Sequence, residues 1–135
     1  TIRRELRLGR KCVSARLSCG LMNRKQFRRF TDRDSGCIHC GELEAVAPHH
    51  RRNRGMGGSK ERDKPANIVV LCSVINGLLE SDADWAKLAR DYGWKLRAGQ
   101  EPKDTPVWYP IRGAWYLLDD QFGKKRVGAS AESAF

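Results

Sequence analysis

The sequence predicts an α+β fold in which a β-hairpin is followed directly by a helix, with a further helix and a second hairpin towards the C-terminus. Three observations support this prediction. A β-branched run at 68–71 follows Pro65 and is typical of a strand. From Ser73 to Glu80 the apolar residues recur every three or four positions, as on one face of a helix. Two aromatic runs, at 107–109 and 114–118, flank a Pro-Ile-Arg-Gly turn and predict the second hairpin.

Length and composition limit the fold and its location. The 135 residues fit one domain, and 40% of them are apolar, which is enough for one modest core. No uninterrupted apolar stretch exceeds five residues, so no segment is long enough to span a membrane. No secretory signal is visible, and five cysteines, an odd number, argue against a disulfide framework. We therefore expect a cytoplasmic protein without a membrane partner.

Positive charge is concentrated in the first half of the chain. The formal net charge is +10, and residues 1–36 contain 11 Lys and Arg against 3 Asp and Glu. Residues 1–20 have no sustained period and are predicted to form a basic arm. Such an asymmetric charge favours a polyanion, so nucleic acid is the leading candidate for a partner. A solvated basic tail that serves only solubility is the alternative.

A short basic helix is predicted at 23–33. Asn23 is a suitable N-cap, and Gln26 three residues later completes a capping box. The two phenylalanines of the segment share one face and are expected to pack in the core, whereas the outer face is basic. On that outer face, Arg28 and Arg29 are candidate nucleic-acid contacts. Ser35 and Gly36 end the helix.

A metal-binding turn, a hairpin and two helices follow. The CIHC motif at 37–40 is a tight turn of the kind that presents two thiolates to one ion. A strand predicted at 43–47 pairs with 68–71 across a long loop rich in Arg and Gly. Helices are predicted at 73–80 and at 82–92, the second capped by Ser81 with Asp84 and ended by Gly93. The region 93–122 contains the aromatic hairpin, and 124–135 is expected to be a loose tail.

The residues best suited to chemistry lie on the first hairpin and its helix. Successive side chains of a strand alternate, so His49 and His50 address different partners. Asn76 and Glu80, four residues apart on a helix, share a face and can address a single ion. One histidine could therefore bind a cation while the other deprotonates a water. Each residue alone is more often structural, but their order beside a CxxC turn in a basic protein favours a functional site.

The stretch 37–82 contains CIHCG, APHHRRNRG and PANIVVLCSVINGLLESD, and it resembles the HNH endonucleases, in particular the small HNH proteins of bacteriophages. The resemblance implies a ββα-metal core of a hairpin plus a helix. By position, it implies that His49 is a metal ligand, that His50 is the general base, and that Asn67 fixes the loop and orients the base. The third signature position falls on Asn76, as in an H-N-N variant, and Glu80 would be a further ligand.

Two kinds of metal follow from this resemblance. An amide oxygen and a carboxylate favour hard ions, so Mg²⁺ or Mn²⁺ is expected at the catalytic centre. Many members of the family also hold a structural zinc with two Cys pairs. Here Cys37, Cys40 and Cys72 match three of those positions, but the fourth is Ile75. Three thiolates could still bind zinc with a fourth ligand, and otherwise Cys72 is a buried thiol. No spacing decides among the candidates for that fourth ligand, which are His39, Cys12 and Cys19.

The activity implied by the resemblance is metal-dependent hydrolysis of DNA phosphodiester bonds by a one-metal mechanism, as nicking or double-strand cutting. Such a phage protein would act in the bacterial cytoplasm on DNA that is double-stranded, with phage packaging or recombination proteins as further partners. The alternatives are a non-catalytic DNA-binding module that keeps the fold, and a nuclease directed at RNA, because no residue here specifically recognises a 2′-hydroxyl. The candidate nucleic-acid contacts are Arg51, Arg52, Arg54, Lys60, Arg28 and Arg29.

Overall fold

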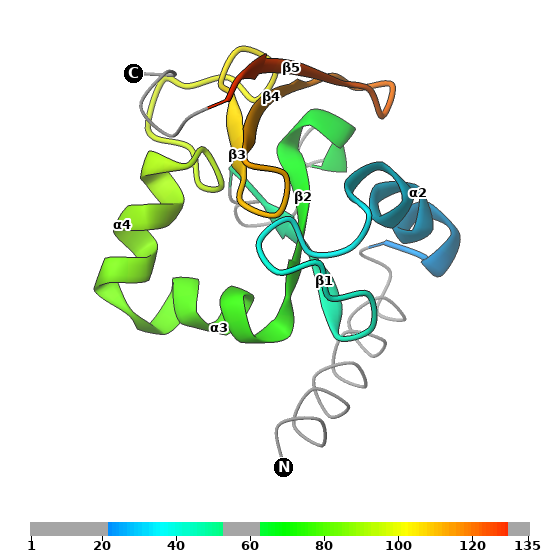
Figure 1. Cartoon of the computed structure of the whole chain (residues 1–135), viewed down its shortest axis with the longest axis horizontal. Coiled ribbons are helices and arrows are strands. Elements are labelled where there is room, and N and C mark those ends of the chain that lie inside the picture. Colours follow the sequence, from blue (N-terminus) through cyan, green and yellow to red (C-terminus); the bar gives the residue numbers. More distant parts are fainter. Residues whose placement is uncertain (1–21, 53–62, 130–135) are drawn as a thin grey trace.

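The computed structural model describes residues 22–52 and 63–129, and it shows the mixed α+β structure that the sequence predicts (Figure 1). The predicted basic arm at 1–20 and the loop residues Arg54 and Lys60 lie outside the described residues. Within the described ranges, no helix is long and apolar enough to cross a membrane. The elements in chain order are α2 (Arg24–Asp34), β1 (Val46–His50), the 3₁₀ helix η2 (Pro65–Asn67), β2 (Ile68–Cys72), α3 (Ser73–Ser81), α4 (Ala83–Asp91), β3 (Val107–Tyr109), β4 (Ala114–Leu118) and β5 (Lys124–Gly128).

Strands β1 and β2 form an antiparallel hairpin, and α3 follows β2 without a connecting loop (Figure 1). The register pairs Val46 with Cys72 and His50 with Ile68. Every residue of β2 is buried, which explains why this strand is a continuous apolar run without polar alternation. Strand β2 therefore lies in the core, and His50, at the end of β1 that leads into the connecting loop, is placed by a strand rather than by a free loop.

The first strand begins later than the predicted 43–47. Leu43 is 66% exposed, and the side chain of Glu42 accepts hydrogen bonds from the backbone N–H groups of Leu43 and Glu44. These residues consequently form a turn. The strand instead continues through Pro48, which is tolerated because β1 pairs along one edge only among the described residues.

Helix α2 forms as its capping signals predict and is joined to the hairpin by a buried polar cluster. The Asn23 side chain accepts from the Gln26 backbone at 2.8 Å, and the Gln26 side chain accepts from the Asn23 backbone. At the other end, the buried Asp34 carboxylate accepts from the backbone N–H of Val70 at 3.0 Å and from the Tyr109 hydroxyl at 2.7 Å. This carboxylate thus links α2, β2 and β3.

Helices α3 and α4 are separated by one residue, Asp82, which is the N-cap of α4. Its carboxylate accepts from the backbone N–H groups of Asp84 and Trp85. The predicted cap at Ser81 is therefore wrong, because the Ser81 hydroxyl donates to the Gly77 carbonyl and belongs to α3. An aspartate carboxylate one residue later performs the same function.

Gly93 ends α4, as predicted, and turns the chain back towards β1. Its φ is +75°, and a Cβ at this position would lie 2.1 Å from the carbonyl oxygen of Pro106. Only glycine fits such a close backbone approach. The turn leads to Trp94, which is fully buried and donates its indole N–H to the Trp108 carbonyl at 2.8 Å.

The aromatic hairpin is part of a three-stranded antiparallel sheet in the order β3-β4-β5. Pairing of β3 with β4 confirms the predicted hairpin. The prediction of a loose tail is wrong for 124–128, because these residues form β5 along β4 (Figure 1). The strand could not be predicted because the sequence of β5 is mostly polar and lacks the apolar alternation typical of a strand. It is stabilised by backbone pairing and by Lys124, whose ammonium group donates to the Arg33 carbonyl and lies 5.5 Å from the ring centre of Tyr116.

Candidate functional site

The two neighbouring histidines at the end of β1 have different partners, as strand alternation predicts. His49 Nε2 lies 2.8 Å from the carbonyl oxygen of Trp94. His50 Nε2 lies 2.8 Å from Oδ1 of Asp63. Because a carbonyl only accepts, His49 carries its proton on Nε2, and the lone pair of the ring is on Nδ1.

The environment of His49 keeps its imidazole neutral. Burial lowers the pKa of His49 to about 4, although hydrogen bonds with the Trp94 carbonyl and the Asn76 side chain oppose the shift. A metal-binding histidine must be neutral, and it usually donates its second ring N–H to a carbonyl or carboxylate. His49 meets both conditions, and Asn76 of α3 contributes an amide beside it.

Asn67 fixes the chain that follows the histidines. Its side chain is buried, with Oδ1 accepting from the backbone N–H of Arg52 at 2.9 Å and Nδ2 donating to the Arg52 carbonyl at 3.2 Å. Its own carbonyl accepts from the backbone N–H of Arg51 at 2.7 Å. Asn67 therefore pairs with two consecutive residues just after His50, which is the arrangement needed to fix that loop.

Arg51 was expected to contact nucleic acid, and that prediction is wrong. The side chain is 0% exposed. Its guanidinium donates to the carbonyl oxygens of Gly93 at 2.7 Å and Thr105 at 2.7 Å, and to those of Ala66 and Pro102 at 2.8 Å each. Burial lowers the pKa of Arg51. The sequence marks this arginine in no way that distinguishes it from the others of the same loop.

The other described candidates for nucleic-acid contact are at the surface. Arg52 is partly exposed, donates to the Gln100 carbonyl, and lies 3.7 Å from a carboxylate oxygen of Glu101. Arg28 and Arg29 are exposed on α2, and the Arg29 guanidinium stacks 4.1 Å above the ring centre of Phe122. The surface of α2 is thus available to a polyanion, whereas Arg52 is already paired.

Glu80 is exposed on α3, one turn after Asn76. Among the described residues, no group of three His, Cys, Asp or Glu side chains within metal-binding distance includes Glu80 or His49. A set of His49, Glu80 and the Asn76 amide contains only two side chains of these types, so the acidic ligand implied by the resemblance stays a prediction. The candidate ligands that the structure brings together are His49 of β1 and Asn76 of α3.

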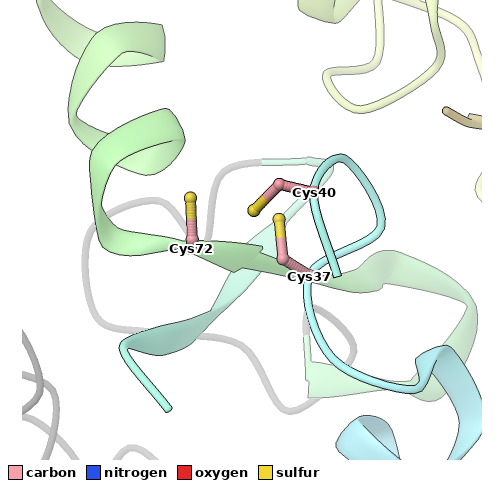
Figure 2. Close-up of side chains that lie close together, drawn as sticks. All are labelled: Cys37, Cys40 and Cys72. Carbon is pink, nitrogen blue, oxygen red and sulfur yellow. The ribbon is translucent and has the colours of Figure 1, made fainter. Parts of the chain in front are cut away.

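A second candidate metal centre is formed by cysteines. The Sγ atoms of Cys37, Cys40 and Cys72 all lie within 4.8 Å of one another, and Figure 2 shows the three side chains converging from the CIHC turn and the end of β2. Hydrogen bonding from Cys72 lowers the pKa of Cys37 to about 5, while the same bond raises the pKa of Cys72. Three soft thiolates can bind a metal ion, and they suit zinc better than Mg²⁺ or Mn²⁺.

His39, one of the candidates for a fourth ligand, does not join this cysteine cluster in the described structure. His39 is outside the group within metal-binding distance, and its ring lies 5.7 Å from that of Trp85 and 6.0 Å from that of Trp94. Its Nδ1 is buried and has no hydrogen-bond partner in the described structure. Ile75 is buried beside the cluster, and the other two candidates, Cys12 and Cys19, lie outside the described residues.

A pocket of about 220 Å³ borders Asn67 and Arg52. Neither His49 nor His50 lines it. Its charged residues are of both signs, and Lys103 lies 3.6 Å from Asp120 across it. The pocket thus shares Asn67 with the candidate site but not its histidines.

Two partners in the site were missed from the sequence: Asp63 and the Trp94 carbonyl. Asp63 is one of several charged residues in a polar loop, and a backbone carbonyl has no residue type that reveals it. Only the antiparallel pairing of His50 with Ile68 could have indicated that residues just before 68 return to the histidines.

Comparison with protein-family models, with curated proteins and with solved structures finds no match to this chain.

Proposed function

We propose that this protein is a metal-dependent endonuclease that hydrolyses phosphodiester bonds of DNA. The observation that carries the proposal is the placement of two differently oriented imidazoles at the end of β1. His49 is neutral, donates from Nε2 to a carbonyl, and lies beside the Asn76 amide. His50 is separately bound, with Nε2 against the carboxylate of Asp63. His49 is therefore suited to bind a cation, and His50 is suited to accept a proton from water.

The order of elements supports the same proposal. A hairpin of β1 and β2 leads directly into α3, so His49 from the strand and Asn76 from the helix meet at one place. Asn67 fixes the loop after His50 through two hydrogen bonds to the Arg52 backbone. Together with His50 as the general base, these residues have the roles that the resemblance to HNH endonucleases implies: metal ligand, general base and a residue that fixes the loop.

In the proposed reaction, His50 accepts a proton from a water molecule whose oxygen attacks phosphorus. His49 and Asn76 would hold the divalent ion, and a hard ion such as Mg²⁺ or Mn²⁺ suits the amide oxygen. Once bound, that ion would stabilise the charge that develops on the leaving oxygen. The exposed arginines of α2 would bind DNA phosphates outside the reaction centre.

The experiment is incubation of supercoiled plasmid with the full chain in EDTA, Mg²⁺, Mn²⁺ and Zn²⁺. Wild-type protein should convert plasmid to open-circular or linear DNA only with metal, and His50→Ala should abolish conversion while leaving DNA binding nearly intact. His39→Gln is the matched control, since it removes an imidazole outside the site. Unchanged cleavage by His50→Ala would refute the assignment, and cleavage of RNA but not DNA would change the substrate.

The second candidate is a DNA-binding module without turnover. The cysteine cluster favours it, because thiolates brought together from a turn and a strand end are typical of a structural zinc site. For this reason we also propose that Cys37, Cys40 and Cys72 bind zinc. If the protein retards DNA on a gel but converts no plasmid in the presence of any of the ions, the binding module is the correct assignment.

A further inference from the structure

His50 is held by a carboxylate that no signature position accounts for. Its Nε2 and Oδ1 of Asp63 are 2.8 Å apart, and the two side chains are 19% and 26% exposed. A carboxylate has no proton to donate, so the hydrogen of this bond belongs to Nε2. The lone pair of His50 is then on Nδ1, and the side chain is partly open to water.

The position of Asp63 is fixed by the same segment that carries Asn67. Asp63 lies two residues before η2, and the Asn67 backbone N–H donates to the Lys64 carbonyl at 2.9 Å. The end of that segment is in turn bound to the chain after His50, through the backbone of Arg51. A short segment therefore binds the histidine by a side chain at one end and the following loop by an amide at the other.

We propose that Asp63 is the positioning residue of the general base, holding His50 in the tautomer whose Nδ1 accepts the proton of water. The inference rests on the proposed function. In the step itself, the water oxygen forms a bond to phosphorus, one proton moves from water to Nδ1, and the bond between phosphorus and the 3′ oxygen breaks. The leaving oxygen takes a proton from solvent, and His50 returns its proton to solvent. Asp63 keeps its charge throughout and stabilises the imidazolium. An orienting carboxylate has the same role beside the histidine base of a catalytic triad.

The test compares Asp63→Ala and Asp63→Glu with wild type in the full chain. Asp104→Ala is the matched control. Asp104 is an exposed aspartate of a later loop, so this substitution removes the same charge elsewhere on the surface. Two measurements are made on each protein. The first is the tautomer of His50, from ¹⁵N chemical shifts of the labelled protein. The second is kcat and KM for cleavage of a DNA duplex, with circular dichroism to confirm folding.

Wild type should show the tautomer protonated on Nε2, and Asp63→Ala should lose it. In Asp63→Ala we expect kcat to fall about 100-fold, within the usual contribution of a general base, at nearly unchanged KM. Asp63→Glu should recover part of kcat, and Asp104→Ala should match wild type. A wild-type His50 protonated on Nδ1, an unchanged kcat in Asp63→Ala, or an equal loss in the control would overturn the inference. If wild type cleaves no nucleic acid, the proposed function fails, and the tautomer comparison alone decides whether Asp63 orients His50.

Discussion

Replacing Arg51 by lysine should destabilise the protein strongly although the charge is kept. The guanidinium makes four hydrogen bonds to backbone carbonyls contributed by three separate segments: the turn after α4, η2, and the loop before β3. A lysine ammonium carries three donors on a flexible stem and cannot reproduce this planar fork. Three donors cannot serve four carbonyls, so at least one carbonyl must lose its partner, and the loss of the planar geometry raises the expected number to two or three while a charge stays buried.

The magnitude follows from these contacts. A hydrogen bond to a charged group contributes about 1.5–3 kcal/mol, and an abandoned buried acceptor costs about 1–3 kcal/mol. Loss of two or three such bonds, partly relieved by relaxation, gives about 3–5 kcal/mol. That is a large share of the total stability of a domain, which is about 5–15 kcal/mol. For a chain of this size we expect Tm to fall by about 10–20 °C.

The assay is urea denaturation followed by tryptophan fluorescence, with thermal unfolding by circular dichroism. Arg52→Lys is the matched control, because Arg52 is the next residue and is partly exposed. The control should lose less than about 1 kcal/mol, as surface substitutions do. Since Gly93, which binds Arg51, precedes the Trp94 carbonyl that holds His49, Arg51→Lys should also slow DNA cleavage. A loss below about 1 kcal/mol for Arg51→Lys would refute the reasoning.

Three further predictions concern single groups. Cys72→Ser should remove most of the zinc retained by protein refolded with zinc, because it takes one of three thiolates from the proposed site; elemental analysis measures the zinc, and full retention would contradict the site. Asp34→Asn should cost about 3–5 kcal/mol, because this carboxylate is buried between Arg33, Tyr109 and the Val70 N–H, and urea denaturation measures the loss. Without added divalent ions, stability should fall as pH drops from 6.5 towards 4, by at most about 3 kcal/mol. The reason is that the pKa of His49 is lowered to about 4, so the unfolded chain takes up the proton first; the same fall in His49→Gln would show that other groups cause it.

Local signals in the sequence predicted the helices and the aromatic hairpin well, because each depends on neighbouring residues. The capping box of Asn23 and Gln26 and the stop at Gly93 both act within a few positions and are present in the structure. The predicted start of the first strand was wrong because the partner strand sets the register of a hairpin. Pairing with 68–72 extends β1 to His50, and no feature of 43–50 alone reveals that.

The site shows the same limit. The resemblance selected His49, Asn67 and Asn76 from their order alone, and the structure gives each of these side chains a hydrogen-bond partner. The burial of Arg51 could not be predicted, because Arg51 belongs to a run of basic residues, and such runs usually lie at the protein surface. Its burial depends on carbonyl groups up to 54 residues away, such as that of Thr105. For the same reason β5 looked like a tail, since its partner is another strand's backbone.

Cys72 belongs to two elements at once, as the last residue of β2 and the N-cap of α3. An ion bound by the three thiolates would bind only the chain in which that junction has formed. The folding equilibrium then depends on the free concentration of the ion, by about 1.4 kcal/mol for each tenfold change above the dissociation constant. Helix α3 carries Asn76, so the fraction of chains in which His49 and Asn76 are brought together would follow the supply of a soft metal, although the proposed reaction centre itself would bind a hard one.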